Sequence, residues 1–402
     1  MSTRETLSTT TTALSRPGRL DAYGTTVFAE MSAEAARLGA VNLGQGFPDT
    51  DGPPEMLEAA QEAIAAGHNQ YPPGRGMPEL LEAVAEHQRR FYGLEVDPSC
   101  EILVTAGATE AIAACMLALC APGDEVVTFE PYYDSYAATI ELSGARRRVV
   151  TLRPPGWSFD PDVLRATVTR DTKVLLLNTP HNPTGRLFKP AELAGIAELC
   201  VEHNLLAITD EVYEHLVFSG SHLPLASLPG MAERTITISS AAKTFSVTGW
   251  KIGWAVGPRR LIEAVRAVKQ FLTYASGTPL QLAVAKGLQL PDSYFAELAS
   301  SLKERGEQLC DGLEALGWRV LRPEATYFAI VDVRALSSDD GWQFCRRLLG
   351  EFGVAAIPTE VFYDDTAAGK PFVRFAFCKR KEVIAEALRR LASVPVEQRG
   401  DA

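Results

Sequence analysis

Val174-Leu175-Leu176-Leu177 leads into a turn-like run from Asn178 to Gly185, then a helical pattern from Pro190 to His203 and a second apolar run, Leu205-Leu206-Ala207-Ile208-Thr209. Both apolar runs are continuous instead of alternating with polar residues, which is typical of strands buried on both faces of a parallel sheet. Pro190 suits the first turn of a helix, because the amide hydrogen that proline lacks has no partner there. A strand, a helix and a second strand in this order predict a βαβ unit.

The same alternation continues on both sides of this unit, from Glu101 to Gly257. Helix-like patterns separate several further apolar runs, each short enough to be a single strand. The runs are Ile102-Leu103-Val104-Thr105, Glu125-Val126-Val127-Thr128-Phe129, Thr235-Ile236-Thr237-Ile238 and Ile252-Gly253-Trp254-Ala255-Val256. Together they predict an α/β domain with a mostly parallel central sheet between helices.

The pattern changes after about Pro258 and predicts a second, smaller α+β domain. Its elements are an amphipathic stretch from Ser293 to Leu316, strand-like runs at 327–331 and 372–377, and a helix-like pattern at 341–352. A chain of 402 residues is long enough for two domains. We expect an N-terminal segment, residues 1–50, that packs on the small domain and the active site, a large domain, residues 51–285, and a small domain, residues 286–402.

The composition narrows the class of protein. The formal charge is −11, from 39 Lys and Arg against 50 Asp and Glu, and a protein that follows a nucleic-acid backbone usually carries a basic stripe. No stretch approaches the roughly 18 apolar residues that span a membrane, and residues 1–15 lack the apolar core of a signal peptide. We therefore expect a cytoplasmic protein without nucleic-acid or membrane partners.

Cysteine and histidine suggest neither a disulfide framework nor a metal site. The seven cysteines are scattered through apolar segments, and no two have C-x-x-C spacing. The six histidines show no H-E-x-x-H pattern. We interpret His181, His215 and the others as surface or packing residues, and expect no metal.

Chemically useful residues follow the predicted strands, at the edge where open α/β sheets bind ligands. Gly107-Ala108-Thr109 lies between a strand and a helix start, where free amide groups attract phosphate, although a plain connection would have the same composition. Asp210 ends another strand and Tyr213 follows it. An aspartate there is either a cap or, beneath an aromatic nitrogen heterocycle, a group that keeps that nitrogen protonated.

Lys243 follows the strand at 235–238 within Ser239-Ser240-Ala241-Ala242-Lys243. The small residues before it would let a cofactor approach, and a second cation, Lys251, stands eight positions later. A lysine with a lowered pKa can form an imine with an aldehyde. A single lysine is more often a solvated surface charge, so Lys243 indicates catalysis only in combination with the other motifs.

Three motifs occur in order: N-P-x-G at Asn182 to Gly185, D-x-x-Y at Asp210 to Tyr213 and S-x-x-K at Ser240 to Lys243, with a basic residue downstream. In this combination the chain resembles the fold-type I enzymes that use pyridoxal 5'-phosphate, and more narrowly the class I aminotransferases. The similarity covers essentially the whole chain, from Asn42 to Phe375. It is greatest to the branch of kynurenine and glutamine transaminases and actinobacterial N-succinyldiaminopimelate aminotransferases.

The resemblance implies roles for individual residues around pyridoxal 5'-phosphate. Lys243 would form the Schiff base and carry the proton during catalysis. Asp210 would pair with the pyridinium nitrogen, which makes the ring an electron sink, and Tyr213 would hydrogen-bond the O3′ atom of the ring. The other implied contacts are Asn182 beside both O3′ and the substrate, Tyr133 stacked on the ring, and Gly107, Ala108, Thr109, Ser240 and Lys251 around the phosphate.

The resemblance also implies a substrate site shared between two subunits of a homodimer. Arg374 would grip the substrate α-carboxylate through a bidentate pair, and Gly46 would lie on the segment that closes over it. Tyr71 matches a tyrosine that reaches the neighbouring subunit's phosphate, and Tyr274 matches a residue of the partner's substrate pocket. Thr26 stands where kynurenine transaminases commonly have tryptophan, which leaves room for a longer or more polar substrate.

These features favour transamination between an L-amino acid and a 2-oxo acid such as 2-oxoglutarate. The alternative is a C–S β-lyase on the same scaffold, because the same carbanion can expel a β leaving group. A regulator that uses this fold as a ligand sensor would carry a helix-turn-helix domain before it, and only a short polar segment precedes the pattern here. The sequence leaves the amino donor open among kynurenine, methionine, glutamine, N-succinyldiaminopimelate and a specialised substrate.

Overall fold

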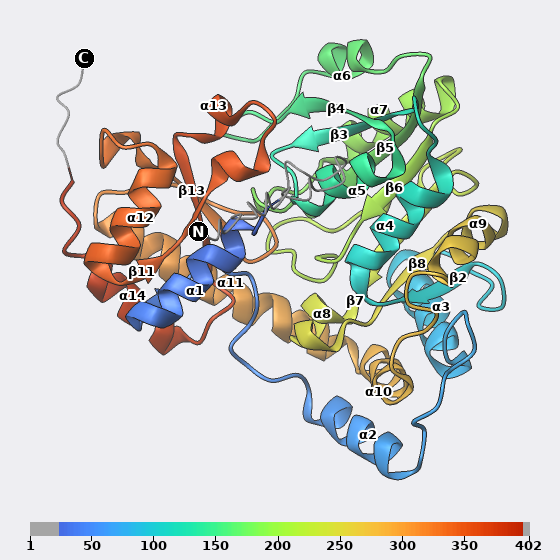
Figure 1. Ribbon diagram of the computed structural model, residues 1–402. Coiled ribbons are helices and arrows are strands. Elements are labelled where there is room, and N and C mark those ends of the chain that lie inside the picture. The colour runs from blue at the N-terminus through green and yellow to red at the C-terminus, as the bar shows by residue number, and fades with distance from the viewer. Residues whose placement is uncertain (1–23, 397–402) are drawn as a thin grey trace, which may run out of the picture.

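The computed structural model describes residues 24–396, so residues 1–23 of the predicted N-terminal segment and 397–402 of the predicted small domain lie outside the described residues. Figure 1 shows a large sheet with its helices and, beside it, a second group of strands and helices. Helix α11 (Asp292–Ala315) belongs to both groups. Its Phe295 packs against the helices of the first group, whereas Leu302 and Leu309 pack in the core of the second.

The large sheet has seven strands, and every neighbouring pair is parallel except the two pairs that contain β8. The strands in spatial order are β2 (Ile102–Thr105), β8 (Gly253–Val256), β7 (Thr235–Ser240), β6 (Leu206–Asp210), β5 (Thr172–Asn178), β3 (Glu125–Glu130) and β4 (Arg146–Thr151). This arrangement confirms the prediction of an α/β fold with a mostly parallel central sheet.

Strand β4 is the strand of the large sheet that the apolar pattern does not reveal. It begins Arg146-Arg147-Arg148 and pairs only with β3, at the edge of the sheet. An edge strand tolerates charged side chains because one of its sides faces water. Arg146 and Arg148 each lie 3.7 Å from the carboxylate of Glu125 on the neighbouring strand.

Helices cover both faces of the sheet, which is why its central strands are apolar throughout. Leu176 of β5 packs with helices on one face, whereas its neighbours Leu175 and Leu177 pack with helices on the other. Each such buried leucine stabilises the fold by about 1.5–3 kcal/mol. The first face carries α4 (Gly107–Leu119), α5 (Ser135–Ser143) and α9 (Arg259–Lys269), and the second carries α6 (Pro161–Thr167) and α7 (Pro190–Glu202).

A third set of helices packs beside β2 and β8. It consists of α2 (Pro54–Ala65), α3 (Pro78–Tyr92) and α10 (Thr278–Leu288). The short helix α8 (Ala241–Thr244) follows β7 directly. Across residues 24–396, no helix combines the length and the apolar character needed to cross a membrane.

The second group is built on a four-stranded antiparallel sheet, and the N-terminal part of the chain joins it. Strand β1 (Val41–Asn42) pairs in parallel with β11 (Val354–Ala355), and Met31 of α1 (Val27–Leu38) is buried in the same core. The four strands in spatial order are β12 (Ile357–Pro358), β13 (Phe372–Ala376), β10 (Phe328–Asp332) and β9 (Arg319–Leu321). The helices are α12 (Gly341–Phe352), α13 (Thr366–Gly369) and α14 (Lys381–Leu391).

Candidate active site

A cavity of about 450 Å³ lies at the carboxyl ends of the central parallel strands, between the two groups. Most of the residues that the sequence indicates contribute to its wall. They are Thr26, Gly46, Gly107, Ala108, Thr109, Tyr133, Asn182, Asp210, Tyr213, Ser240, Lys243, Lys251 and Arg374. The structure thus brings together residues from widely separated segments of the chain, as expected for the edge of an open α/β sheet.

Two of the predicted residues lie elsewhere on this chain. Tyr71 is 83% exposed and Tyr274 is 48% exposed, and their rings contact each other at a centroid distance of 5.3 Å. Neither contributes to the wall of the cavity. Their roles toward a second subunit stay predictions.

One end of the cavity is suited to an anion. Helix α4 begins at Gly107, and no side chain within the described part of the chain caps its first amide groups. Lys251, held at a left-handed φ of 54°, places its Nζ 3.4 Å from the position that a Cβ of Gly107 would occupy. Amide groups, the helix dipole and a cation at one point form an anion site of the kind that binds phosphate.

Close backbone packing holds this end in shape. Gly253 of β8 lies directly behind the first turn of α4, and a Cβ on it would come within 2.7 Å of the Gly107 carbonyl carbon. Real side chains do not approach so closely, so the position needs glycine. The sequence shows a glycine here, but only the packing explains it.

Asp210 supplies a buried carboxylate at the end of β6. It is 5% exposed, and Tyr136 of α5 donates a hydrogen bond of 2.5 Å to its Oδ2. Burial raises the pKa of Asp210 to about 6, against the opposing effects of Tyr136, the Val212 amide and Lys243. Such a group is well placed to hold a protonated ring nitrogen, since a cation beside it would remove the cost of its charge.

Tyr136 is a site residue that the sequence reasoning missed. It lies three residues after Tyr133, which precedes α5, and the two rings meet edge to face at a centroid distance of 5.8 Å. No motif in the sequence marked Tyr136. Its hydroxyl orients the Asp210 carboxylate.

Lys243 lies in α8, three residues after β7 ends at Ser240. Its Nζ is 5.9 Å from the ring centroid of Tyr213 and 5.8 Å from that of Tyr327. Burial lowers the pKa of this amine to about 8. A substantial fraction is therefore unprotonated slightly above neutral pH, which an amine needs to attack an aldehyde or accept a proton.

Arg374 is fixed in the wall of the same cavity. It lies on β13, an interior strand that pairs with β10 on one side and β12 on the other. Only 2% of Arg374 is exposed, and its guanidinium donates to Asn182 Oδ1 at 2.8 Å and to the Gly44 carbonyl at 3.0 Å. Nε of Arg374 has no partner among the described residues. A rigid, buried cation of this kind fits a carboxylate.

Asn178 is a second residue that the motifs did not single out. Its Oδ1 accepts a hydrogen bond of 2.7 Å from the Asn182 amide, and its Nδ2 donates to the Asp210 carbonyl at 2.8 Å. It therefore ties the turn after β5 to the end of β6. The sequence reveals a turn at Asn178, but not which of its side chains would face the neighbouring strand.

Comparison with known proteins agrees with this geometry. The family model for aminotransferase class I and II matches residues 39–391. The chain is 55% identical over 386 residues to a probable N-succinyldiaminopimelate aminotransferase of Mycobacterium tuberculosis, covering 93% of this chain and 97% of that protein. It is 40% identical over 374 residues to the methionine aminotransferase of Escherichia coli, with the same two coverages.

A solved structure shows the same architecture. The N-succinyldiaminopimelate aminotransferase from Mycobacterium tuberculosis superposes with a TM-score of 0.93 at 54% identity, covering 94% of this chain and all of that one. Fold, motifs and overall similarity thus agree over nearly the full length. The chain belongs to the class I and II aminotransferases and is a pyridoxal-phosphate-dependent transaminase.

Proposed function

We propose that this protein transfers the amino group of an L-amino acid to a 2-oxo acid such as 2-oxoglutarate, with pyridoxal 5'-phosphate held in the cavity through a Schiff base with Lys243. The observation that carries this proposal is that Lys243, Asp210 and Arg374 all line one cavity. An amine with a lowered pKa, a buried acid and a buried guanidinium match the aldehyde, the ring nitrogen and the substrate carboxylate respectively.

The anion site at the start of α4 completes the fit to this cofactor. Gly107, Ala108 and Thr109 offer uncapped amide groups, with Lys251 beside them and Ser240 on the wall. A phosphate there would be held by the helix dipole and a point charge. Tyr133 is proposed to stack on the ring, and Asn182 and Tyr213 to hydrogen-bond its hydroxyl.

The cofactor, when bound, supplies an aldehyde for covalent capture of the amine and an electron-withdrawing ring. The chain supplies the remaining functions. Asp210, oriented by Tyr136, keeps the ring nitrogen protonated, and Arg374 holds the substrate α-carboxylate so that the Cα–H bond points toward Lys243. The Lys243 amine then accepts the proton from Cα of the amino donor. It donates this proton back later in the same transfer.

The segment around Gly46 limits access of water. Tyr327 Oη donates a hydrogen bond of 2.8 Å to the Gly46 carbonyl, and a Cβ on Gly46 would meet the Phe328 ring at 2.7 Å. The segment therefore lies directly against the aromatic floor of the cavity. We propose that it closes over the substrate during transfer.

We propose a donor with a long, polar side chain, of the N-succinyldiaminopimelate type, in preference to an aromatic amino acid. Thr26 and Gln45 line the cavity and place polar groups in a part of the wall that also contains Phe28 and Phe47. Thr26 also caps α1 by accepting a hydrogen bond from the Ala29 amide at 3.3 Å, which limits its movement. The 55% identity to a probable N-succinyldiaminopimelate aminotransferase supports the same class.

We also propose a homodimer with shared active sites. Exposed aromatic and aliphatic side chains gather on the loop after α9 and the loop after α2: Phe271 is 86% exposed, Tyr71 83%, Tyr274 48% and Leu272 45%. Exposed apolar side chains at this density are typical of an interface. Sedimentation velocity on the intact protein would report a single species of twice the chain mass, and a monomer at micromolar concentration would contradict the dimer.

A donor panel tests the reaction and the substrate together. The holoenzyme is supplied with 2-oxoglutarate and, in separate reactions, N-succinyldiaminopimelate, methionine, glutamine or kynurenine, and glutamate formation is measured. We expect the highest kcat/KM with N-succinyldiaminopimelate and the lowest with kynurenine. Kynurenine as the best donor would contradict the proposed substrate class. Pyruvate and ammonia from a cysteine conjugate, without glutamate formation from any donor, would contradict transamination.

A further inference from the structure

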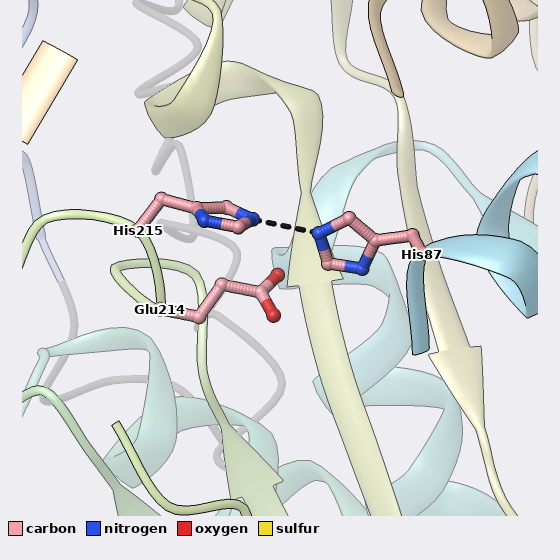
Figure 2. A group of neighbouring side chains, drawn as sticks. All are labelled: His87, Glu214 and His215. Carbon is pink, nitrogen blue, oxygen red and sulfur yellow. Dashed lines mark hydrogen bonds between the residues drawn. The ribbon is translucent and has the colours of Figure 1, made fainter. Parts of the chain in front are cut away.

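A buried polar cluster adjoins the candidate active site, and none of its three central residues lines the cavity. Figure 2 shows its centre, His87 of α3 with Glu214 and His215, which follow β6. His87 is 1% exposed and Glu214 is 5% exposed. Buried charged groups are costly unless they are paired, so the partners of this carboxylate indicate its purpose.

Two imidazoles and a carboxylate form a donor set that zinc uses, but the contacts point to another role. Nε2 of His87 and Nε2 of His215 are 2.6 Å apart and hydrogen-bonded to each other. The lone pair of one of these nitrogens therefore already accepts the proton of the other and is not available to a metal ion. Tetrahedral ligands at about 2.0–2.1 Å from zinc lie farther apart than this. Both oxygens of Glu214 also accept hydrogen bonds, from Ser239 Oγ at 2.5 Å and from Tyr92 Oη at 2.6 Å.

The Ser239–Glu214 hydrogen bond connects residues that adjoin the candidate active site. Successive side chains of a strand point to opposite faces; Ser240 faces the cavity and Ser239 does not. In the turn after β6, Tyr213 likewise lines the cavity while Glu214 does not. The hydrogen bond therefore joins two segments just outside the cavity wall. In the turn after β6 the neighbouring residue Tyr213 lines the cavity, and at the end of β7 the neighbouring residue Ser240 lines it.

The position of this bond along the strands adds to the argument. The parallel pairing of β6 with β7 ends at Asp210 and Ile238, and the last backbone hydrogen bond runs from the Glu211 amide to the Ile238 carbonyl at 2.8 Å. Beyond that point the described backbone shows no further bond between the two segments. The Ser239–Glu214 hydrogen bond connects the two segments just beyond the point where the backbone hydrogen bonds between β6 and β7 end.

The electrostatic surroundings keep Glu214 able to accept these bonds. Burial works against its ionisation, but the adjacent His87 and His215 and the hydrogen bonds from Ser239 and Tyr92 together hold its pKa below the usual value. An ionised carboxylate makes shorter and stronger hydrogen bonds than a neutral acceptor. The contact is thus a firm connection between the end of β7 and the turn after β6.

We propose that Glu214 and Ser239 are positioning residues, whose mutual hydrogen bond sets the distance between Tyr213, in the turn after β6, and Ser240 and Lys243, at and just after the end of β7. The inference rests on the proposed function, because it concerns residues that would contact pyridoxal 5'-phosphate. Neither Glu214 nor Ser239 touches the cavity, and their effect is transmitted only through their neighbours in the chain.

The test compares two hydroxyl deletions on the same carboxylate. Ser239→Ala removes the bond between the end of β7 and the turn after β6, whereas Tyr92→Phe removes the similarly short bond from α3 and leaves those two segments joined. Both proteins are purified as holoenzyme, and the visible absorbance of the cofactor is titrated with pH. The cofactor dissociation constant and the thermal midpoint are measured alongside. Ser239→Thr, which keeps the hydroxyl, serves as the rescue variant.

We expect Ser239→Ala to shift the midpoint of the absorbance titration by about one pH unit and to weaken cofactor binding about tenfold, as loss of one well-placed hydrogen bond would. Tyr92→Phe should lower the thermal midpoint to a similar extent with no shift in the absorbance titration, and Ser239→Thr should restore the wild-type titration. Equal shifts in the two deletions, or no shift in Ser239→Ala, would overturn the proposal. Wild-type protein without a visible absorbance band would instead refute the proposed function itself.

Discussion

Replacement of Asp210 by asparagine measures how much the buried carboxylate charge destabilises the folded protein, apart from the proposed role of that charge in holding the cofactor. In the protein without cofactor, Asp210 has a pKa of about 6 instead of 3.8, chiefly because burial disfavours its ionised form. At about 1.36 kcal/mol per pKa unit, the ionised carboxylate costs the folded state about 3 kcal/mol. Asparagine keeps an oxygen that can accept the Tyr136 hydrogen bond but carries no charge at any pH.

The sign of the pH dependence follows from the raised pKa. Between pH 3.8 and 6 the folded protein holds a proton on Asp210 that the unfolded chain has released, so the contribution of this group to stability falls as pH rises through that window. Above pH 6 the wild-type apoprotein bears the full cost. From pH 5 to pH 8 the stability of Asp210→Asn relative to wild type should therefore rise by about 1.4 kcal/mol.

Urea denaturation of the two apoproteins at equal concentration, followed by circular dichroism at pH 5 and at pH 8, measures this difference. The other ionisable groups are common to both proteins and cancel in the comparison. Asp171→Asn, at an exposed aspartate, serves as control and should change the unfolding free energy equally at both pH values. A difference for Asp210→Asn that stays constant or falls between pH 5 and pH 8 would refute the reasoning.

Three further substitutions probe the site. Lys243→Ala should lower glutamate formation by at least about 100-fold, since it removes the proposed attachment point and proton carrier; full turnover would contradict that assignment. Arg374→Lys should raise KM for the amino donor about 10- to 100-fold with a smaller change in kcat, because lysine offers no bidentate pair; an unchanged KM would be the opposing result. Gly253→Ala should weaken cofactor binding about tenfold by displacing Gly107, whereas Gly249→Ala, which meets no atom within 4 Å, should not; equal dissociation constants in the two variants would show that close packing at Gly253 is unimportant.

The predictable part of the fold is the part that local patterns encode. The continuous apolar run at Val174 to Leu177 and the helical pattern from Pro190 to His203 correspond closely to β5 and α7. Strand β4 was not predicted because its arginines carry no apolar signal. Its place at the edge of the sheet depends on pairing with β3 and not on its own composition. The parallel order of the strands likewise depends on long-range pairing.

The candidate site shows the same division. Lys243, Asp210 and Asn182 belong to short motifs that can be recognised in one dimension, and all three line the cavity. Tyr136 and Asn178 line it too, but neither belongs to those motifs, and each becomes meaningful only through its hydrogen bonds around Asp210.

The sequence alone therefore determined the α/β architecture and the family, because both depend on hydrophobic periodicity and on motifs a few residues long. Tertiary structure alone decided which side chains meet: Arg374 and Asn182 are 192 positions apart and share a hydrogen bond of 2.8 Å, and Ser239 and Glu214 are 25 apart and share one of 2.5 Å. A hydrogen bond forms only within about 3 Å, and the spatial order of the strands, which no single segment encodes, brings these pairs within that distance.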